Sequence, residues 1–189
     1  MPALYVDDPG TRARVGMPAP DFSLQTAGNE QWRLSDHLGA VTVLLFYPQN
    51  ETLVCTKQLC SVRDNWECYL ETRATIVGIS PSTPGEQKQF AERRHLPLPL
   101  LADPNREVTR IFGRHWLYPI NFTRAVVVVD AKGVVRNCDI MLRAFRPSDE
   151  QIITDIYAAR GDAFNEKYEQ LKGRIANVKF GAQIKENGQ

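Results

Sequence analysis

Two cysteines, Cys55 and Cys60, follow a proline and a threonine, Pro48 and Thr52, at short fixed spacing. The residues after Pro48 have the composition of a polar loop leading into a helix, and Cys55 falls in the first turn of that helix. Because the free N–H groups and the dipole at a helix N-terminus favour anions, a thiol placed there loses its proton more readily. The thiolate is the nucleophile, so this pattern indicates a reactive Cys55 with the Thr52 hydroxyl nearby.

The elements expected around Cys55 place it at the base of a pocket. The almost entirely apolar run 41–47 predicts a strand buried on both faces, and Pro48, which lacks an N–H, ends it. A helix is expected over 53–72, and Cys60 lies on its polar, outward side. The inward, apolar face of this helix carries Cys55, Leu59, Val62 and Trp66.

The spacing of the two cysteines has a consequence for their chemistry. Five residues of ideal helix separate two Cα atoms by about 8.6 Å, whereas a disulfide needs them within about 7 Å. A Cys55–Cys60 disulfide therefore requires the start of the helix to unwind, and the polar loop 49–51 is expected to allow this. The alternative is that both are inert thiols, since free cysteine often behaves as a small buried hydrophobe.

The pattern Pro-x-x-x-Thr-x-x-Cys, formed by Pro48, Thr52 and Cys55, resembles the active-site motif of the peroxiredoxins. With Cys60 in Cys-Thr-Lys-Gln-Leu-Cys, the chain is similar to the Q-type or bacterioferritin-comigratory subgroup of the AhpC/TSA family over residues 15–156.

The chain departs from the subgroup at two places. Leu53-Val54 stands where Q-type relatives often carry Pro-Gly, which is expected to stiffen the loop and narrow access to the pocket. Gln58 stands where relatives commonly have Glu, so a carbonyl acceptor is kept and the charge is absent.

The resemblance implies a thiol peroxidase of the atypical two-cysteine kind that needs no cofactor. Hydrogen peroxide and alkyl hydroperoxides are the implied substrates. In the implied cycle, Cys55 attacks the peroxide and becomes a sulfenic acid. Cys60 then condenses with it to an intramolecular disulfide, which an external dithiol protein, usually thioredoxin in the family, reduces by exchange.

The same resemblance assigns the remaining site residues. The Thr52 hydroxyl and the Cys55 N–H would stabilise charge on the leaving oxygen. Arg124, just before a run of four valines, would hold the thiolate with its permanent charge, the alternative being a surface arginine at a strand edge. Pro48 would shield the sulfur from water, and Tyr47 would pack beside it.

Other candidate residues are expected to have structural roles. Cys68 and Cys138 are interpreted as packed thiols that could act only as reserve resolving thiols, and Arg63 as one member of an ion pair. Three histidines, His37, His95 and His115, are scattered without metal-ligand spacing. A metal site built from Cys55, Cys60 and Cys68 is excluded because the three positions splay around and along one helix.

Bulk properties exclude several classes of protein. A chain of 189 residues with a net charge of +1 gives no electrostatic support for a nucleic-acid or membrane-surface role. No apolar run reaches the length of a membrane span, and residues 1–16 lack the pattern of a secretory signal. Four cysteines are too few for a disulfide scaffold and fit a reducing cytoplasm.

The remaining pattern predicts an α/β, thioredoxin-like fold: a central mixed sheet flanked by helices, with a C-terminal helical extension. Residues 1–160 are expected to form one domain, beginning with an irregular arm, and 161–189 the extension. Strands are expected at 21–24, 41–47, 75–80, 97–101, 124–130 and 134–139, with a hairpin turn at 131–133. Helices are expected at 34–39 (one turn), 53–72, 85–95, 105–112, where Asp103 or Asn105 is the N-cap, and 147–159.

The extension carries an apolar stripe at alternating four- and three-residue steps. Its members are Phe164, Tyr168, Leu171, Ile175 and Val178, with Gly173 on the exposed side. The stripe either packs on its own domain or forms a homodimer contact, so both a monomer and a dimer are open.

Two other functions compete with the peroxidase. One is a peroxide-sensing switch or holdase, in which the disulfide alters a binding surface with little turnover. The other is a thioredoxin-like exchange protein, which the absence of Cys-x-x-Cys disfavours.

Overall fold

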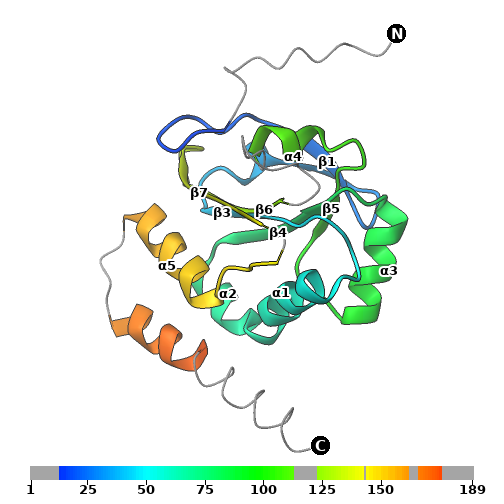
Figure 1. Cartoon of the computed structure of the whole chain (residues 1–189). Helices are drawn as coiled ribbons and strands as arrows, with labels where there is room; N and C mark the ends of the chain where they lie inside the picture. Colours follow the sequence, from blue (N-terminus) through cyan, green and yellow to red (C-terminus); the bar gives the residue numbers. More distant parts are fainter. Residues whose placement is uncertain (1–12, 113–122, 143, 162–165, 176–189) are drawn as a thin grey trace, which may run out of the picture.

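The structure, a computed structural model, describes residues 13–112, 123–142, 144–161 and 166–175. Its strands form one mixed sheet in the order β2-β1-β5-β4-β3-β6-β7 (Figure 1). The strands are β1 (Ser23–Thr26), β2 (Gln31–Arg33), β3 (Thr42–Phe46), β4 (Thr75–Ser80), β5 (Leu100–Ala102), β6 (Thr123–Val129) and β7 (Val135–Leu142). The helices are η2 (Leu34–His37), α1 (Leu53–Asp64), α2 (Trp66–Thr72), α3 (Pro84–Arg94), α4 (Glu107–Phe112) and α5 (Asp149–Arg160), with a further helical stretch at 166–175.

The centre of the sheet is β3, which pairs in parallel with β4 and antiparallel with β6. All five of its residues are buried, as expected for an apolar strand covered on both faces. Side chains alternate along a strand, so Val43 and Leu45 enter one hydrophobic core and Leu44 and Phe46 the other.

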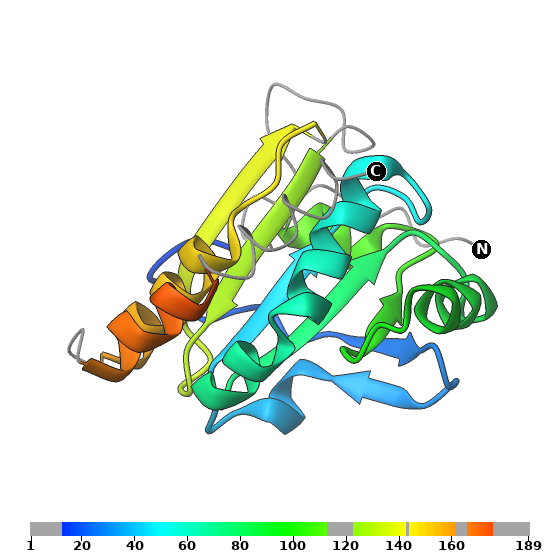
Figure 2. The same cartoon turned by 90° about the horizontal axis from the view of Figure 1, so that it is seen from below.

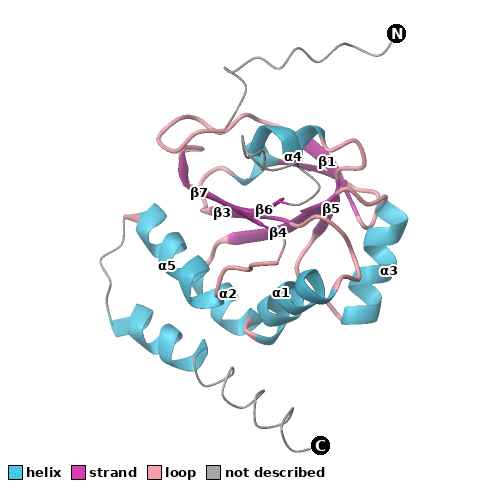
Figure 3. Cartoon of the chain, viewed as in Figure 1, coloured by secondary structure: helices cyan, strands magenta, loops and turns pink. Residues whose placement is uncertain are grey.

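Helices cover both faces of the sheet, which confirms the expected α/β architecture (Figure 3). On one face, α1, α2, α3, α5 and the stretch 166–175 contribute buried side chains to a single core. On the other face, α4 and η2 pack with the aromatic residues of the β1–β2 region. Figure 1 shows α1, α2 and α5 below the sheet and α4 above it.

The single helix expected over 53–72 is wrong, because it is interrupted at Asn65. Asn65 has φ −104° and ψ 17°, and its side-chain amide donates to the Ser61 carbonyl at 2.9 Å and to the Asp149 carboxylate at 3.2 Å. Asp149 also accepts hydrogen bonds from the Ser61 hydroxyl and, at 2.7 Å, from the Tyr69 hydroxyl. A buried carboxylate at the start of α5 thus binds both sides of the break and fixes the end of α1.

The stretch 166–175 packs on its own domain. Tyr168, Leu171 and Ile175 are buried in the core that also contains Cys55, while Phe164 and Val178 lie outside the described residues. The Tyr168 ring lies 5.3 Å from the Tyr157 ring of α5, and the two helices lie side by side in Figure 2. Any homodimer contact would need other residues than these three, and the domain boundary at 160 stays a prediction.

Other elements differ from expectation mainly at their ends. The first strand lies two residues later than expected, β5 is limited to 100–102, and β7 extends to Leu142. The short strand β2 was not predicted, since only Trp32 of its three residues is buried. The turn at 131–133 is confirmed, with Gly133 at φ 80°. Within the described ranges, no helix is long and apolar enough to cross a bilayer.

Candidate active site

The reactive-cysteine candidate and the buried arginine lie in direct contact. Arg124 donates from Nη2 to the Cys55 Sγ at 3.2 Å, and each residue is only 1% exposed. The register that pairs Phe46 with Ala125 explains this contact, because it brings the start of β6 to the end of β3, where the chain turns into α1. The interpretation of Arg124 as a surface arginine is therefore wrong.

Gln58, one helical turn after Cys55, holds the same guanidinium. Its Oε1 accepts a hydrogen bond from Arg124 Nη1, and the side chain is 2% exposed. The carbonyl thus fulfils the acceptor role expected from the sequence. Because an amide is neutral, Gln58 positions the arginine without cancelling its positive charge.

The helix start also favours an anion at Cys55. Thr52 is the N-cap residue of α1 in an extended conformation, and its carbonyl accepts the first helical hydrogen bond, from Thr56 N–H at 2.8 Å. Its side chain makes no capping hydrogen bond. The first turn, residues 53–56, is uncharged, so no carboxylate there competes with a thiolate for the helix dipole.

A pocket of about 430 Å³ has Cys55 in its lining. Pro48, Thr52, Leu53 and Cys55 contribute to its lining, so all the motif residues face one space. Pro48 is buried. A larger hollow of about 730 Å³ lies at the other end of β3 and has no cysteine in its lining, so the smaller pocket is the candidate site.

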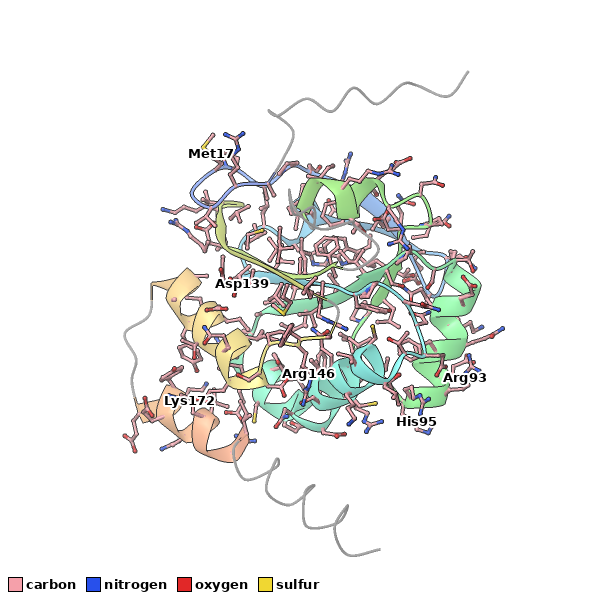
Figure 4. The ribbon with its side chains drawn as sticks, in the orientation of Figure 1. Met17, Arg93, His95, Asp139, Arg146 and Lys172 are labelled. Carbon is pink, nitrogen blue, oxygen red and sulfur yellow. The ribbon has the colours of Figure 1, made fainter. Side chains whose placement is uncertain are left out.

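The loop before α1 is tied to α3. Glu51 has φ 59° and forms ion pairs with Arg93 at 3.2 Å and with Arg94 at 2.9 Å. Asn50 accepts a hydrogen bond from the Ser80 hydroxyl at 3.2 Å. Figure 4 shows the Arg93 side chain on α3. These contacts anchor the chain immediately before the segment that contains both cysteines.

Tyr47 belongs to the same hydrophobic core as Cys55, as expected. Its hydroxyl donates to Gln87 Oε1 at 2.9 Å. Burial raises the pKa of Tyr47 well above the ordinary phenol value, so its hydroxyl stays protonated within the core.

Cys60 is half-buried rather than fully outward, and all four cysteines are free thiols. Its helix, α1, is continuous from residue 53 to residue 64. In this reduced, helical state the two sulfurs of Cys55 and Cys60 are not bonded, so the resolving role of Cys60 stays a prediction.

The other thiols lie in packed environments. Cys68 is buried, and burial raises the pKa of its thiol. Burial, together with the Asp139 carboxylate, raises the pKa of Cys138 to about 11, and its Sγ donates to the Phe112 carbonyl at 3.6 Å. Both observations fit the expected structural role, because a thiol with a raised pKa is a poor nucleophile near neutral pH.

The remaining candidates are also structural. Arg63 forms the expected ion pair, with Asp64 at 2.8 Å, and also donates to the Arg94 carbonyl. His37 stacks on Trp32 at 4.6 Å between ring centroids, and His95 is exposed (Figure 4). His115 lies outside the described residues.

Comparisons with known proteins identify the family to which the chain belongs. The family model described as AhpC/TSA family matches residues 15–138. The chloroplastic peroxiredoxin Q of Populus jackii is 35% identical over 130 residues, which is 66% of this chain and 59% of that protein. Peroxiredoxin Bcp of Bacillus subtilis is 33% identical over 126 residues, 63% of this chain and 80% of that protein. The chain thus spans about three fifths of the length of the Populus relative.

Two solved structures confirm the expected thioredoxin-like fold. The crystal structure of peroxidoxin BcpB from Mycobacterium tuberculosis matches with a TM-score of 0.65 and 31% identity, over 79% of this chain and 98% of that one. A cysteine-to-serine mutant of Xanthomonas campestris peroxiredoxin Q matches with a TM-score of 0.58 and 22% identity, over 63% of this chain and 80% of that one, which bears on the fold alone. From the family model and the M. tuberculosis structure, the chain belongs to the AhpC/TSA family and is related to peroxiredoxins of the Q and Bcp kind.

Proposed function

We propose that this protein is a thiol peroxidase in which Cys55 reduces hydrogen peroxide and organic hydroperoxides. The observation that carries the proposal is the 3.2 Å contact between the Arg124 guanidinium and the Cys55 sulfur, at a helix start that opens onto a pocket. Family membership supports the same chemistry. A permanent cation beside the sulfur stabilises the thiolate, which is the form that attacks an O–O bond.

In the first step, the Cys55 thiolate attacks one oxygen of the peroxide R–O–O–H. An S–O bond forms and the O–O bond breaks, so that the sulfur is oxidised to Cys55–SOH and the oxygens are reduced. The leaving oxygen takes a proton and departs as water or as the alcohol ROH. The Arg124 guanidinium, the Thr52 hydroxyl and the helix N–H groups are the donors placed to stabilise the negative charge on that oxygen.

In the second step, the Cys60 thiol condenses with Cys55–SOH, forming a disulfide and releasing water. Because the helix holds the two Cα atoms about 8.6 Å apart, the segment between them must unwind. Fixed contacts lie on both sides of this segment. Before it, Glu51 forms ion pairs with α3, and after it, Ser61 donates a hydrogen bond to Asp149. We therefore place the unwinding between residues 53 and 60.

In the third step, an external dithiol protein of the thioredoxin type reduces the disulfide by exchange and returns both thiols.

Monomeric or homodimeric assembly and a cytoplasmic location stay predictions of the sequence.

Hydrogen peroxide consumption by purified protein, followed in a stopped-flow instrument, tests the proposed function. The wild-type protein should remove peroxide rapidly at submicromolar concentration and turn over when thioredoxin and its reductase are added. Cys55→Ser should abolish the reaction, whereas Cys138→Ser, which removes a thiol outside the pocket, should not. Consumption that survives in Cys55→Ser would refute the proposal.

The same experiment separates the peroxidase from a peroxide-sensing switch or holdase. Slow oxidation of Cys55 without turnover, even with thioredoxin present, would favour the switch, because a sensor needs one oxidation event and no rapid recycling.

A further inference from the structure

A second hollow lies at the end of β3 opposite Cys55. Its volume is about 730 Å³, within the range of about 300–1,000 Å³ that is usual for small-molecule sites. Four segments meet around it: the residues before β3, the end of α2, the turn between β6 and β7, and the end of α5. Figure 1 shows α2 and α5 on the same side of the sheet, which lets their ends face one space.

Small side chains form much of the lining. Among the described residues that line the hollow, none is aromatic and Val41 is the only large aliphatic one. The small residues are Gly39, Ala40, Ala131, Ala158, Ala159 and Gly161. The hollow therefore lacks the apolar surface and the rings that would hold a hydrophobic molecule or a nucleobase.

The charged side chains around the hollow are mostly cationic. Four basic residues contribute to its lining: Arg73, Lys132, Arg136 and Arg160. Asp130 is the one carboxylate among the described lining residues, and it forms an ion pair with Arg136 at 2.6 Å. The charge of Asp130 is thus matched by Arg136, and the local excess is positive although the whole chain carries only +1.

Two of these cations have no acidic partner in the part of the chain that the structure describes. Arg73 and Lys132 are both exposed, and no described carboxylate lies within ion-pair distance of either one. They come from separate segments, since Arg73 follows α2 and Lys132 lies in the turn between β6 and β7. Two positive charges therefore remain available to a ligand in one hollow.

Helix ends at the hollow reduce this excess without cancelling it. The C-termini of α2 and α5 each carry the equivalent of about half a negative charge. Arg160 donates to the Thr72 carbonyl at 2.8 Å, so it already covers the end of α2. Lys132 belongs to no helix, so its position is not explained by a helix dipole.

We propose that this hollow binds a small anion that carries two or more phosphate groups, with Arg73 and Lys132 as its principal contacts. A guanidinium binds two phosphate oxygens at once, and an ammonium binds them as a point charge. A chain of phosphate groups fits a space with small walls, several cations and no ring to stack on. The site does not depend on the proposed function, because its lining shares no residue with the pocket at Cys55.

Isothermal titration calorimetry with tripolyphosphate at low ionic strength tests the proposal. Wild type should bind it, and binding should weaken as sodium chloride is added, because salt screens exposed charges. The double variant Arg73→Gln/Lys132→Gln should bind about tenfold more weakly, since each exposed ion pair contributes a factor of up to about five. Absence of binding to wild type at millimolar tripolyphosphate would overturn the proposal.

The matched control is Lys88→Gln/Arg110→Gln, which removes two exposed positive charges from α3 and α4, outside the lining. It should bind within about twofold of wild type, because salt screens charges that do not touch the ligand. Equal weakening in the two double variants would mean that net charge attracts the anion and would refute the site. Cys55→Ser should bind as wild type does, so a failure of the peroxidase proposal leaves this test intact.

ATP shows which part of a ligand is recognised. Because no ring among the described residues lines the hollow, ATP should bind no more tightly than tripolyphosphate. Much tighter binding of ATP would contradict recognition of the phosphate groups alone.

Discussion

Replacing Arg124 by glutamine tests how much the guanidinium contributes to the reaction. At 3.2 Å from the sulfur, a unit positive charge interacts with a thiolate by about 5 kcal/mol at an effective dielectric constant of about 20. When the guanidinium is removed, nearby dipoles and water rearrange and restore part of this stabilisation. In enzymes, removal of one such donor raises the activation free energy by about 2.7–4 kcal/mol. Since about 1.4 kcal/mol corresponds to a factor of ten, we expect the rate constant to fall about 100- to 1,000-fold.

The assay is the second-order rate constant for hydrogen peroxide at pH 7, measured by competition with a heme peroxidase. Arg124→Lys should lie between wild type and Arg124→Gln, because an ammonium keeps the charge but lacks the planar fork that reaches Gln58 and Cys55 together. Arg63→Gln is the matched control, since Arg63 lies on α1 but pairs with Asp64, and it should react as wild type does.

Removing a buried arginine also affects folding, so each variant is first compared with wild type by thermal unfolding and circular dichroism. Arg124→Met, which fills space without charge, separates packing from electrostatics and should be as slow as Arg124→Gln. A folded Arg124→Gln protein that reacts within threefold of the wild-type rate would refute the assignment of the charge to this step.

Three further outcomes are expected. Cys60→Ser should react with one equivalent of peroxide at the wild-type rate and then stall with thioredoxin present, as shown by rapid-quench turnover; normal turnover would mean that Cys60 does not resolve Cys55. Asp149→Ala should lower the free energy of unfolding, measured in urea, by about 2–4 kcal/mol, because it leaves several buried donors unpaired. The control Glu150→Ala changes an exposed neighbour and should alter this free energy by less than about 1 kcal/mol. Equal effects of the two substitutions would contradict the anchoring role of Asp149. Asp130→Asn should lower the free energy of unfolding by about 1–2 kcal/mol at pH 7 and by less toward pH 3. Burial opposes ionisation of this carboxyl, but its hydrogen bonds outweigh burial and lower its pKa, so its contribution to stability is present above the unfolded-state pKa and is lost as the pH falls through the lower native pKa. A decrease that urea titrations show to be constant across this pH range would exclude the linkage.

The elements nearest the site could be predicted because their signals are local. A buried strand such as β3 is nearly continuous in apolar residues, and Pro48 marks where it must end. The candidate residues Thr52 and Cys55 follow at fixed spacing, so the helix start and the pocket could be placed together. Arg124 needed the family resemblance, since nothing in its own neighbourhood distinguishes a buried guanidinium from a surface one.

The features that could not be predicted depend on partners far away in the sequence. The break at Asn65 is fixed by Asp149, which lies 84 residues later, and no local pattern signals that hydrogen bond. The burial of Gln58 on α1 depends on Arg124 of β6, which lies 66 residues away in the sequence. The apolar stripe of the C-terminal stretch fitted two environments equally well. The burial of Tyr168, Leu171 and Ile175 in the core of their own domain distinguishes them.

The loop before α1 also depends on partners that are distant in the sequence. Its polar residues suggested freedom to unwind, but Glu51 is held by two arginines of α3. Because these ion pairs are partly exposed, they contribute little to stability. We therefore expect them to direct the unwinding to the residues that follow rather than to prevent it.

The central claim is that the Cys55 sulfur is the atom that peroxide oxidises. The most direct measurement is mass spectrometry of the Cys60→Ser protein after one equivalent of hydrogen peroxide, with dimedone present to trap a sulfenic acid. We predict a single dimedone adduct on the peptide that contains Cys55. An adduct on Cys68 or Cys138 instead, or no adduct while peroxide persists, would contradict the claim.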